Sequence, residues 1–232
     1  GFGETAEAFR LTALEMHHDV TVIQARLRGA PAVLRLNTLG RHFAVNAMGV
    51  LAAVEALSGD PTRAAVDLFR WQPPAGRGRR ETISLDPADT RAYFELIDDA
   101  YNANPASMEA ALEVLAASDP QERMGQGARR IAILGDMLEL GREEAQSHAQ
   151  LAQNKHLLTV DVVHCVGPRM RACYEALPAA IRGRWVPEAE ELASGLGELI
   201  AAGDRVLVKG SLGSKVSMIV DLIRNLGHRS QP

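Results

Sequence analysis

Residues 93–105 read Tyr93-Phe94-Glu95-Leu96-Ile97-Asp98-Asp99-Ala100-Tyr101-Asn102-Ala103-Asn104-Pro105. The first five residues are mainly apolar, which is typical of a short, mostly buried strand. Asn104 is a suitable N-cap and Pro105 a suitable first helical residue, so we expect a helix over residues 105–117. The stretch therefore predicts a strand that ends in a polar corner and leads directly into a helix.

The chain around and after this corner repeats the alternation of strand and helix. Strands are expected at 82–85, 93–98, 130–134, 160–166, 184–186 and 204–209, and helices at 105–117, 143–157, 168–177, 188–201 and 214–226. Short apolar strands separated by helices indicate an α/β fold with a doubly wound, mainly parallel sheet. Ligands of such sheets bind beyond the carboxyl ends of the strands. The residues just after Ile97, Leu134 and Val208 are therefore the first candidates for a site.

The chain before residue 75 is organised differently. Strands are expected at 20–27 and 32–36, followed by helices at 42–58, with Gly59 as C-cap, and from Pro61 to about residue 69. Residues 73–80, Pro-Pro-Ala-Gly-Arg-Gly-Arg-Arg, have no apolar period and indicate a linker. An ordinary surface loop and an arginine-rich RNA-binding tail are the alternatives for this segment. We therefore expect a first domain at 1–75, a hinge at 76–81 and a second domain at 82–232.

Composition restricts the classes of protein. The 232 residues include 25 Lys and Arg against 29 Asp and Glu, and a net charge of −4 argues against nucleic-acid binding. Cys165 and Cys173 cannot build a disulfide framework, which suits a reducing compartment. Asn46 and Glu55 interrupt the apolar stretch at 43–57, and no signal peptide is visible at the first residues. We expect a cytoplasmic protein without membrane insertion.

The polar corners carry the candidate binding groups. Asp98 and Asp99 could accept hydrogen bonds from a ribose diol, and Asn102 and Asn104 could recognise an amide-containing ligand. Equally, one aspartate could cap local backbone while the asparagines only shape the turn. Asp136 and Glu139 add two acids after the strand at 130–134, or else cap the following helix. On the same pattern, His148 in that helix is expected to be a surface or packed residue.

A third strand end leads into Lys209-Gly210-Ser211-Leu212-Gly213-Ser214-Lys215. Backbone N–H groups, a hydroxyl and a lysine there favour binding of a carboxylate or phosphate. The phosphate-binding motif G-x-x-x-x-G-K-[ST] occurs nowhere in the chain. In the first domain, His42 and Asn46 share one helical face, where Asn46 could recognise an adenine edge or lie buried against backbone.

Taken together, these stretches resemble the Mur ligases, most closely the MurF type. The matching strings, in the family's order, are Gly40-Arg41-His42-Phe43-Ala44-Val45-Asn46-Ala47, Gly76-Arg77, Asp98-Asp99-Ala100-Tyr101-Asn102-Ala103-Asn104-Pro105, Ile133-Leu134-Gly135-Asp136-Met137-Leu138-Glu139-Leu140-Gly141 and Val208-Lys209-Gly210-Ser211. The strings D-D-x-Y-N-A-N-P and L-G-D-M-x-E-L-G are specific to the MurF type among Mur ligases.

The resemblance implies an ATP- and Mg²⁺-dependent amide ligase of peptidoglycan, and hence bacterial cell-wall, biosynthesis. Such an enzyme joins D-alanyl-D-alanine to UDP-N-acetylmuramoyl-tripeptide through an acyl phosphate. The family has an N-terminal UDP-sugar domain, a central ATPase domain and a C-terminal Rossmann-like domain. By position, this chain would hold a partial α/β remnant of the central domain followed by the C-terminal domain.

The resemblance also implies roles for single residues. ATP would be bound by His42, Asn46, Arg77 and Asp99, with Asn46 at adenine, Asp99 at the ribose and Arg77 at the phosphates. Arg77 and Lys209 would be catalytic. The D-alanyl-D-alanine side would be lined by Tyr101, Asn102, Asn104, Asp136, Lys209, Gly210 and Ser211. No metal ligand is expected in this chain, because the Mg²⁺ ligands would lie in the absent part.

Two departures from the family pattern qualify this reading. The phosphate-binding loop and the UDP-sugar domain are absent, so the chain alone is expected to be inactive and to need those missing domains as partners. Leu212 stands where the family usually has an arginine. A stand-alone module that binds a nucleotide or small anion is the alternative function. A folylpolyglutamate synthase-like ligase is a second one, disfavoured by the D-D-x-Y-N-A-N-P string.

Overall fold

The computed structural model describes residues 1–17, 19–118 and 128–226. The chain divides into two compact units, Gly1–Pro73 and Pro74–Pro232. Each unit has its own hydrophobic core and is described by itself.

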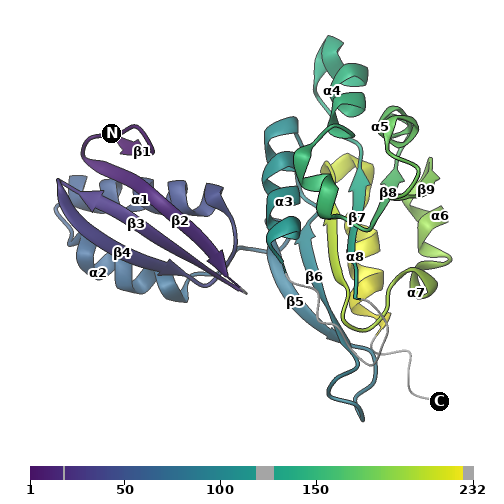
Figure 1. Cartoon of the computed structure of the whole chain (residues 1–232), viewed down its shortest axis with the longest axis horizontal. Coiled ribbons are helices and arrows are strands. Elements are labelled where there is room, and N and C mark those ends of the chain that lie inside the picture. The colour runs from purple at the N-terminus through teal and green to yellow at the C-terminus, as the bar shows by residue number, and fades with distance from the viewer. Residues whose placement is uncertain (18, 119–127, 227–232) are drawn as a thin grey trace. The chain divides into compact units, whose positions relative to one another are not determined.

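The first unit is a four-stranded sheet with helices on one face (Figure 1). Its strands are β1 (Phe2–Gly3), β2 (Phe9–His17), β3 (Val20–Leu27) and β4 (Ala30–Leu36), in that spatial order. Strands β2, β3 and β4 are antiparallel, and β1 pairs parallel to β2. Helices α1 (Arg41–Ala56) and α2 (Pro61–Asp67), with the 3₁₀ turn η1 (Leu68–Arg70), follow. The sequence pattern missed β2, because a bulge between Leu11 and Ala13 breaks its alternation.

Helix α1 ends differently from the expectation. Ser58, not Gly59, adopts the left-handed conformation after the helix, with φ of 63°. The Gly59 N–H donates to the Val54 carbonyl at 2.8 Å and the Ser58 N–H to the Glu55 carbonyl at 2.9 Å. This is a Schellman pattern with Ser58 at the position glycine usually takes. Gly59 is needed for space instead, since a Cβ there would lie 2.8 Å from Val54 Cγ1.

The second unit confirms the doubly wound, mainly parallel sheet. Its strands are β5 (Arg79–Ser84), β6 (Tyr93–Asp99), β7 (Arg130–Gly135), β8 (Val162–Val166), β9 (Arg182–Val186) and β10 (Arg205–Lys209). The spatial order is β5-β6-β10-β7-β8-β9, and only the edge strand β5 is antiparallel to its neighbour. Strand β5 begins at Arg79, so residues 79–81 of the expected hinge belong to the sheet.

The helices of the second unit are shorter than the pattern predicts. They are α3 (Pro105–Ala117), α4 (Glu144–Leu151), α5 (Arg171–Ala176), α6 (Ala189–Ala193), α7 (Leu196–Leu199) and α8 (Ser217–Arg224), with 3₁₀ turns η2 (Gly141–Glu143), η3 (Lys155–Thr159) and η4 (Leu212–Ser214). Only α3 has its expected bounds. The expected helix at 143–157 breaks after α4, where the Asn154 side chain caps η3. The one at 188–201 divides at Gly195, where a Cβ would lie 2.8 Å from Arg184 Nη1.

Alternation along the central strands gives the sheet two faces, each covered by its own helices. Phe94 and Leu96 of β6 face the same side as Val206 and Val208 of β10, where α6 and α8 complete one apolar core. The buried residues of α3 lie outside that core, and α3 and α8 cover opposite faces (Figure 1). Side chains alternate along a strand, so the successive residues Asp98 and Asp99 point to opposite faces.

Two further properties of the described residues bear on class. Among their helices, none combines the length and the apolarity needed to cross a bilayer. Both cysteines are buried and free, with Cys165 in β8 and Cys173 in α5. A hydrogen bond with the Cys173 thiol, together with burial, raises the pKa of Cys165, so it stays a protonated core residue.

Buried His164 in β8 predicts a loss of stability in acid. Its Nδ1 accepts the Arg184 N–H at 3.0 Å, and burial lowers its pKa from 6.5 to about 4. The unfolded chain therefore binds a proton more readily between these pH values, and stability falls as the pH drops from about 6.5 to about 4. The expected loss for the second unit is about 3 kcal/mol.

Urea unfolding followed by Trp185 fluorescence checks this expectation in a Trp71→Phe background, because Trp185 is then the only tryptophan. His164→Asn keeps an acceptor near the position of Nδ1 but cannot titrate. Its stability should be lower at pH 7 and should fall less steeply on acidification. Equal slopes for the two proteins would refute the assignment of the acid sensitivity to His164.

Candidate functional site at the carboxyl edge of the parallel sheet

A buried ion pair joins the ends of two neighbouring parallel strands. Lys209 of β10 and Asp99 of β6 are register partners, and Lys209 Nζ lies 2.7 Å from Asp99 Oδ2. Lys209 Nζ also donates to the Asn102 carbonyl at 2.9 Å. The Lys209 side chain is 2% exposed and that of Asp99 19%. The Lys209 side chain is therefore buried beneath the polar corner that follows β6, while the Asp99 carboxylate reaches the protein surface there.

Burial governs the electrostatics of this pair. It lowers the pKa of Lys209 and raises the pKa of Asp99, while their mutual attraction and hydrogen bond oppose both shifts. Each group therefore needs the other in order to stay charged. Removing one partner leaves a desolvated charge without compensation.

Arg77 and Tyr101 complete the group of side chains. The Arg77 guanidinium lies over the Tyr101 ring, 4.4 Å from its centroid, and both residues are exposed. The Arg77 charge also acts on both members of the ion pair. It opposes the effect of burial on the pKa of Asp99 and adds to the effect of burial on the pKa of Lys209. We call Arg77, Asp99, Tyr101 and Lys209 the strand-end cluster. The structure brings these four predicted residues together.

The loops beside the cluster are fastened to one another. Ser211 Oγ accepts the Leu138 N–H at 2.9 Å and donates to the Ala103 carbonyl at 3.4 Å. Its own N–H donates to the Asp136 carbonyl at 3.0 Å. Gly210 is required here, because a Cβ would lie 3.0 Å from the Gly135 Cα. The loops after β6, β7 and β10 therefore form one connected surface.

Asp136 is a buried acceptor for protein donors. Its Oδ1 accepts the Met170 N–H at 2.8 Å, and its Oδ2 lies 3.5 Å from Arg169 Nη1. Burial is the main cause of its raised pKa. A Cβ on Gly167 would collide with this carboxylate at 2.4 Å, so Asp136 depends on glycine in the loop after β8. The carboxylate therefore fastens that loop to the strand ends.

His148 has a part in this surface that its position in the sequence did not reveal. It is fully buried, its Nε2 accepts the Met137 N–H at 3.0 Å, and its Nδ1 lies 2.7 Å from the Glu144 carbonyl. The Nδ1–H tautomer satisfies both contacts. Of the two alternatives expected from the sequence, a surface residue or a packed one, His148 is the packed one. It holds the loop after β7 through its contact with Met137.

The asparagines divide between two uses. Asn104 Oδ1 accepts the Ser107 N–H at 2.8 Å and Ser107 Oγ accepts the Asn104 N–H at 3.0 Å, a reciprocal capping box for α3. The Asn104 carboxamide oxygen therefore shapes the turn, which was the alternative to its recognising an amide-containing ligand. Asn102 gives its carbonyl to Lys209 and is an exposed residue.

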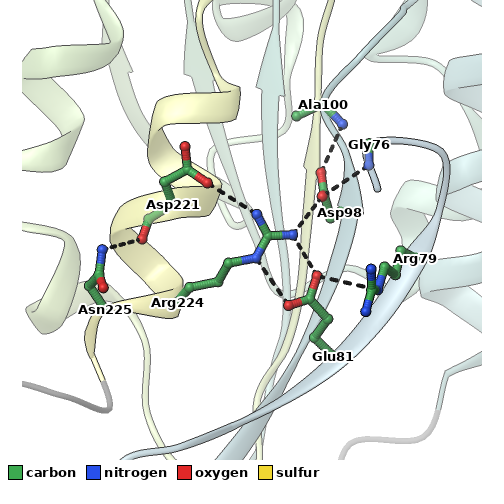
Figure 2. Close-up of polar contacts among 8 residues, drawn as sticks. All are labelled: Gly76, Arg79, Glu81, Asp98, Ala100, Asp221, Arg224 and Asn225. Carbon is green, nitrogen blue, oxygen red and sulfur yellow. Dashed lines mark hydrogen bonds and ion pairs between the residues drawn. The ribbon is translucent and has the colours of Figure 1, made fainter. Parts of the chain in front are cut away.

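Asp98 is buried against protein donors, so the expectation that it could accept a ribose diol is wrong, and it is the aspartate that binds local backbone N–H groups. It is 3% exposed, and its carboxylate accepts the N–H of Gly76 at 3.0 Å and that of Ala100 at 3.3 Å. Figure 2 shows Arg224 of α8 reaching both Asp98 and Glu81 of β5, with Nη2 2.8 Å from Asp98 Oδ2. The sequence does indicate that the two aspartates have different surroundings, because the strand pleat turns one of two successive residues toward the α8 face.

His42 and Asn46 belong to the first unit, in α1. Asn46 is exposed, so the alternative of a buried asparagine bonded to backbone does not apply. His42 is partly buried, with its ring 3.9 Å from that of Phe43. In residues 1–17, 19–118 and 128–226, no three or more histidine, cysteine or acidic side chains gather as a metal ion would need.

A doubly wound, mainly parallel sheet defines this unit as an α/β domain, the fold class in which ligands bind beyond the carboxyl ends of the strands. Residues 78–212, more than half of the chain, match the family model described as "Mur ligase, glutamate ligase domain". The chain belongs to the Mur ligase family.

Similar proteins are named more narrowly. The UDP-N-acetylmuramoyl-tripeptide–D-alanyl-D-alanine ligase of Rickettsia prowazekii is 32% identical over 181 residues, which cover 78% of this chain and 37% of the relative. The enzyme of that name from Escherichia coli is 32% identical over 190 residues, 81% of this chain and 38% of the relative. This chain therefore spans well under half the length of these relatives.

Solved structures agree with the fold. A MurF from Acinetobacter baumannii superposes with a TM-score of 0.76 at 26% identity, over 96% of this chain and 46% of that one. A MurF ligase from Thermotoga maritima in complex with ADP gives a TM-score of 0.77 over 99% of this chain and 49% of that one. At 18% identity, the latter likeness concerns the fold alone.

The ion pair predicts a large effect of a single substitution. Lys209→Met leaves Asp99 desolvated without its cation and should lower the stability of the second unit by roughly 2–4 kcal/mol. Adding Asp99→Asn should restore at least half of the loss, because the stranded charge is removed. Trp185 fluorescence during urea unfolding, again in the Trp71→Phe background, measures both variants.

Lys215→Met is the matched control for this experiment. Lys215 follows the same loop, but its side chain is 66% exposed and 4.0 Å from its partner Glu190. Its replacement should change stability by no more than about 0.5 kcal/mol. Equal losses for Lys209→Met and Lys215→Met would contradict the importance of the buried pair.

Proposed function

We propose that this chain is part of an ATP-dependent amide ligase that joins D-alanyl-D-alanine to UDP-N-acetylmuramoyl-tripeptide during bacterial peptidoglycan synthesis. One observation carries the proposal. The strand-end cluster is built from the Gly76-Arg77, D-D-x-Y-N-A-N-P and Lys-Gly-Ser strings, within a chain 32% identical to relatives with that named activity. Such nucleotide-linked precursors are made in the cytoplasm, where we place the protein.

The cluster fits a nucleoside polyphosphate. Arg77 is an exposed cation backed by an aromatic ring, which suits a phosphate chain. Asp99 presents an acceptor at the surface for ribose hydroxyls, with one oxygen fixed by Lys209. ATP would supply the phosphoryl group that activates the substrate carboxylate, and Mg²⁺ would offset its charge. We assign phosphate contact to Arg77 and ribose contact to Asp99. Adenine contact by Asn46, with His42 on the same helix, remains what the family resemblance implies.

Lys209 acts in this proposal by holding the corner in shape. Its ammonium fixes both the Asp99 carboxylate and the Asn102 carbonyl. The resemblance implies a catalytic role for Lys209, but its side chain is only 2% exposed, so we give it a positioning role instead. Because burial lowers the pKa of Lys209, a negative charge bound near the corner would also favour its charged form. Lys209 therefore links binding on the nucleotide side to the loop that follows β6.

We place D-alanyl-D-alanine beside the same corner. Tyr101 and Asn102 are exposed there and can contact the dipeptide directly. Asn104, Asp136, Gly210 and Ser211 would act through the shape of their loops, since their polar contacts are to protein groups. A closed arrangement of this corner against the nucleotide would align the amine and exclude water from the acyl phosphate.

A chimera tests the proposal. This chain would replace the aligned stretch of the Escherichia coli relative, and phosphate release would be measured with and without D-alanyl-D-alanine. The chimera should show dipeptide-dependent ATP hydrolysis, and Arg77→Ala or Asp99→Ala should reduce it at least about tenfold, the expected cost of one charged contact. Arg171→Ala removes an exposed arginine paired with Glu175 on α5 and serves as the control.

A folded chimera without dipeptide-dependent turnover would contradict the proposal, as would full activity in both variants. The isolated chain makes a second test. By itself it should hydrolyse no ATP and bind nucleotide weakly, because it spans well under half the length of the relatives with the named activity. Tight nucleotide binding in calorimetry would favour a stand-alone binding module instead.

A further inference from the structure

The segment that carries Arg77 is a tight loop fastened to the end of β6. In this junction loop, residues 74–78, the Arg77 N–H donates to the Pro74 carbonyl at 3.1 Å. Gly76 and Gly78 flank Arg77 with φ of 74° and 85°, values that favour glycine. The Gly76 N–H donates to Asp98 Oδ2 at 3.0 Å, and the Gly78 N–H to the Asp98 carbonyl at 2.8 Å. Residue 98 thus holds the loop on both sides of Arg77.

The Asp98 carboxylate can play this part because it is itself held in place. It lies almost fully buried on the α8 face of the sheet, where an unpaired charge would be costly. Arg224 Nη2 donates to it at 2.8 Å, and the Ala100 N–H donates at 3.3 Å (Figure 2). The Gly76 N–H therefore donates to a carboxylate that is held in one orientation.

Arg224 is suited to this place by its shape. Its Nε donates to Glu81 Oε2 at 3.0 Å, its Nη2 reaches both Glu81 and Asp98, and its Nη1 lies 3.1 Å from Asp221 Oδ1. A planar fork can serve several carboxylates in this way, whereas a lysine ammonium cannot reproduce the geometry. The hydrogen bond with Arg224 lowers the pKa of Glu81, so the contact persists in mild acid.

We propose that Asp98 and Arg224 are positioning residues for Arg77. Contacts that run from Arg224 through Asp98 to the Gly76 N–H hold the junction loop so that the Arg77 guanidinium stays over Tyr101, beside Asp99. The inference rests on the proposed function, in which Arg77 binds phosphates. It adds that helix α8, near the end of the described chain and on the opposite face from Lys209, sets the position of that cation.

The inference is tested without any ligand, by ¹⁵N NMR on the whole chain. Two signals report on the loop: hydrogen exchange of the Gly76 amide, and the Arg77 Nε–H shift caused by the Tyr101 ring, which Tyr101→Leu identifies. Asp98→Asn and Arg224→Gln should speed exchange at Gly76 by about tenfold, as expected for a lost charged hydrogen bond. Both should also move the Arg77 signal toward its Tyr101→Leu position. Arg224→Lys keeps a cation near Asp98 and should restore part of the protection.

Glu81→Gln is the control that separates positioning from general loosening. This substitution removes a charged partner of Arg224, whereas the hydrogen bond of the Gly76 N–H is with Asp98 and not with Glu81. It should lower the stability of the unit while changing exchange at Gly76 no more than about twofold. The inference is overturned if Asp98→Asn leaves both signals unchanged, or if Glu81→Gln moves them as far as Arg224→Gln does.

Adding ADP to the same samples separates this inference from the proposed function. We expect ADP to shift the Arg77 signal of the wild-type chain and to bind the Asp98→Asn and Arg224→Gln chains at least about tenfold more weakly. Altered loop signals in the variants without any ADP effect on the wild type would leave the positioning intact and remove the phosphate role. Wild-type ADP affinity in variants with altered loop signals would overturn positioning as a contribution to binding.

Discussion

The contact between Lys209 and Asp99 is the constraint on which the candidate site depends. A lysine sealed at the end of a central strand must have a carboxylate beside it, and parallel pairing of β10 with β6 supplies one in register. The same ammonium holds the Asn102 carbonyl and so shapes the turn into α3. One buried charge therefore fixes the register of two strands, the course of a loop and the orientation of the carboxylate that reaches the surface.

The strand pleat gives the site a second side. Because Asp98 and Asp99 are consecutive, one faces α3 and the ion pair while the other faces α8 and Arg224. Asp98 holds the junction loop from behind, and Arg77 projects from that loop toward Asp99 and Tyr101. The cation and the carboxylate of the cluster are thus positioned from opposite faces of one strand. This arrangement connects α8 to the loop that begins the second unit.

Local sequence was sufficient where the deciding contacts are local. The start of α3 follows from Asn104 and Pro105, and the mainly parallel sheet from short apolar strands between helices. Prediction from local sequence failed where the partner is distant. Arg224 lies 126 positions from Asp98, so no spacing rule connects the two residues. Asp136 and Asn104 have the residue types of ligands, yet protein donors already engage both side chains. The Met170 N–H and Arg169 contact Asp136, and the Ser107 N–H donates to Asn104. Residue type and position at a strand end predict where polar groups gather, and only the fold determines which of them are already engaged.

The central claim is that the strand-end cluster forms one side of a nucleotide site. Titration of the ¹⁵N-labelled chain with MgADP tests it most directly, since weak binding is still visible as chemical-shift changes. We predict that the changes concentrate at residues 76–77, 99–102 and 209–211 and disappear in an Asp99→Asn chain. Changes confined to other parts of the second unit, or unaltered by that substitution, would contradict the claim.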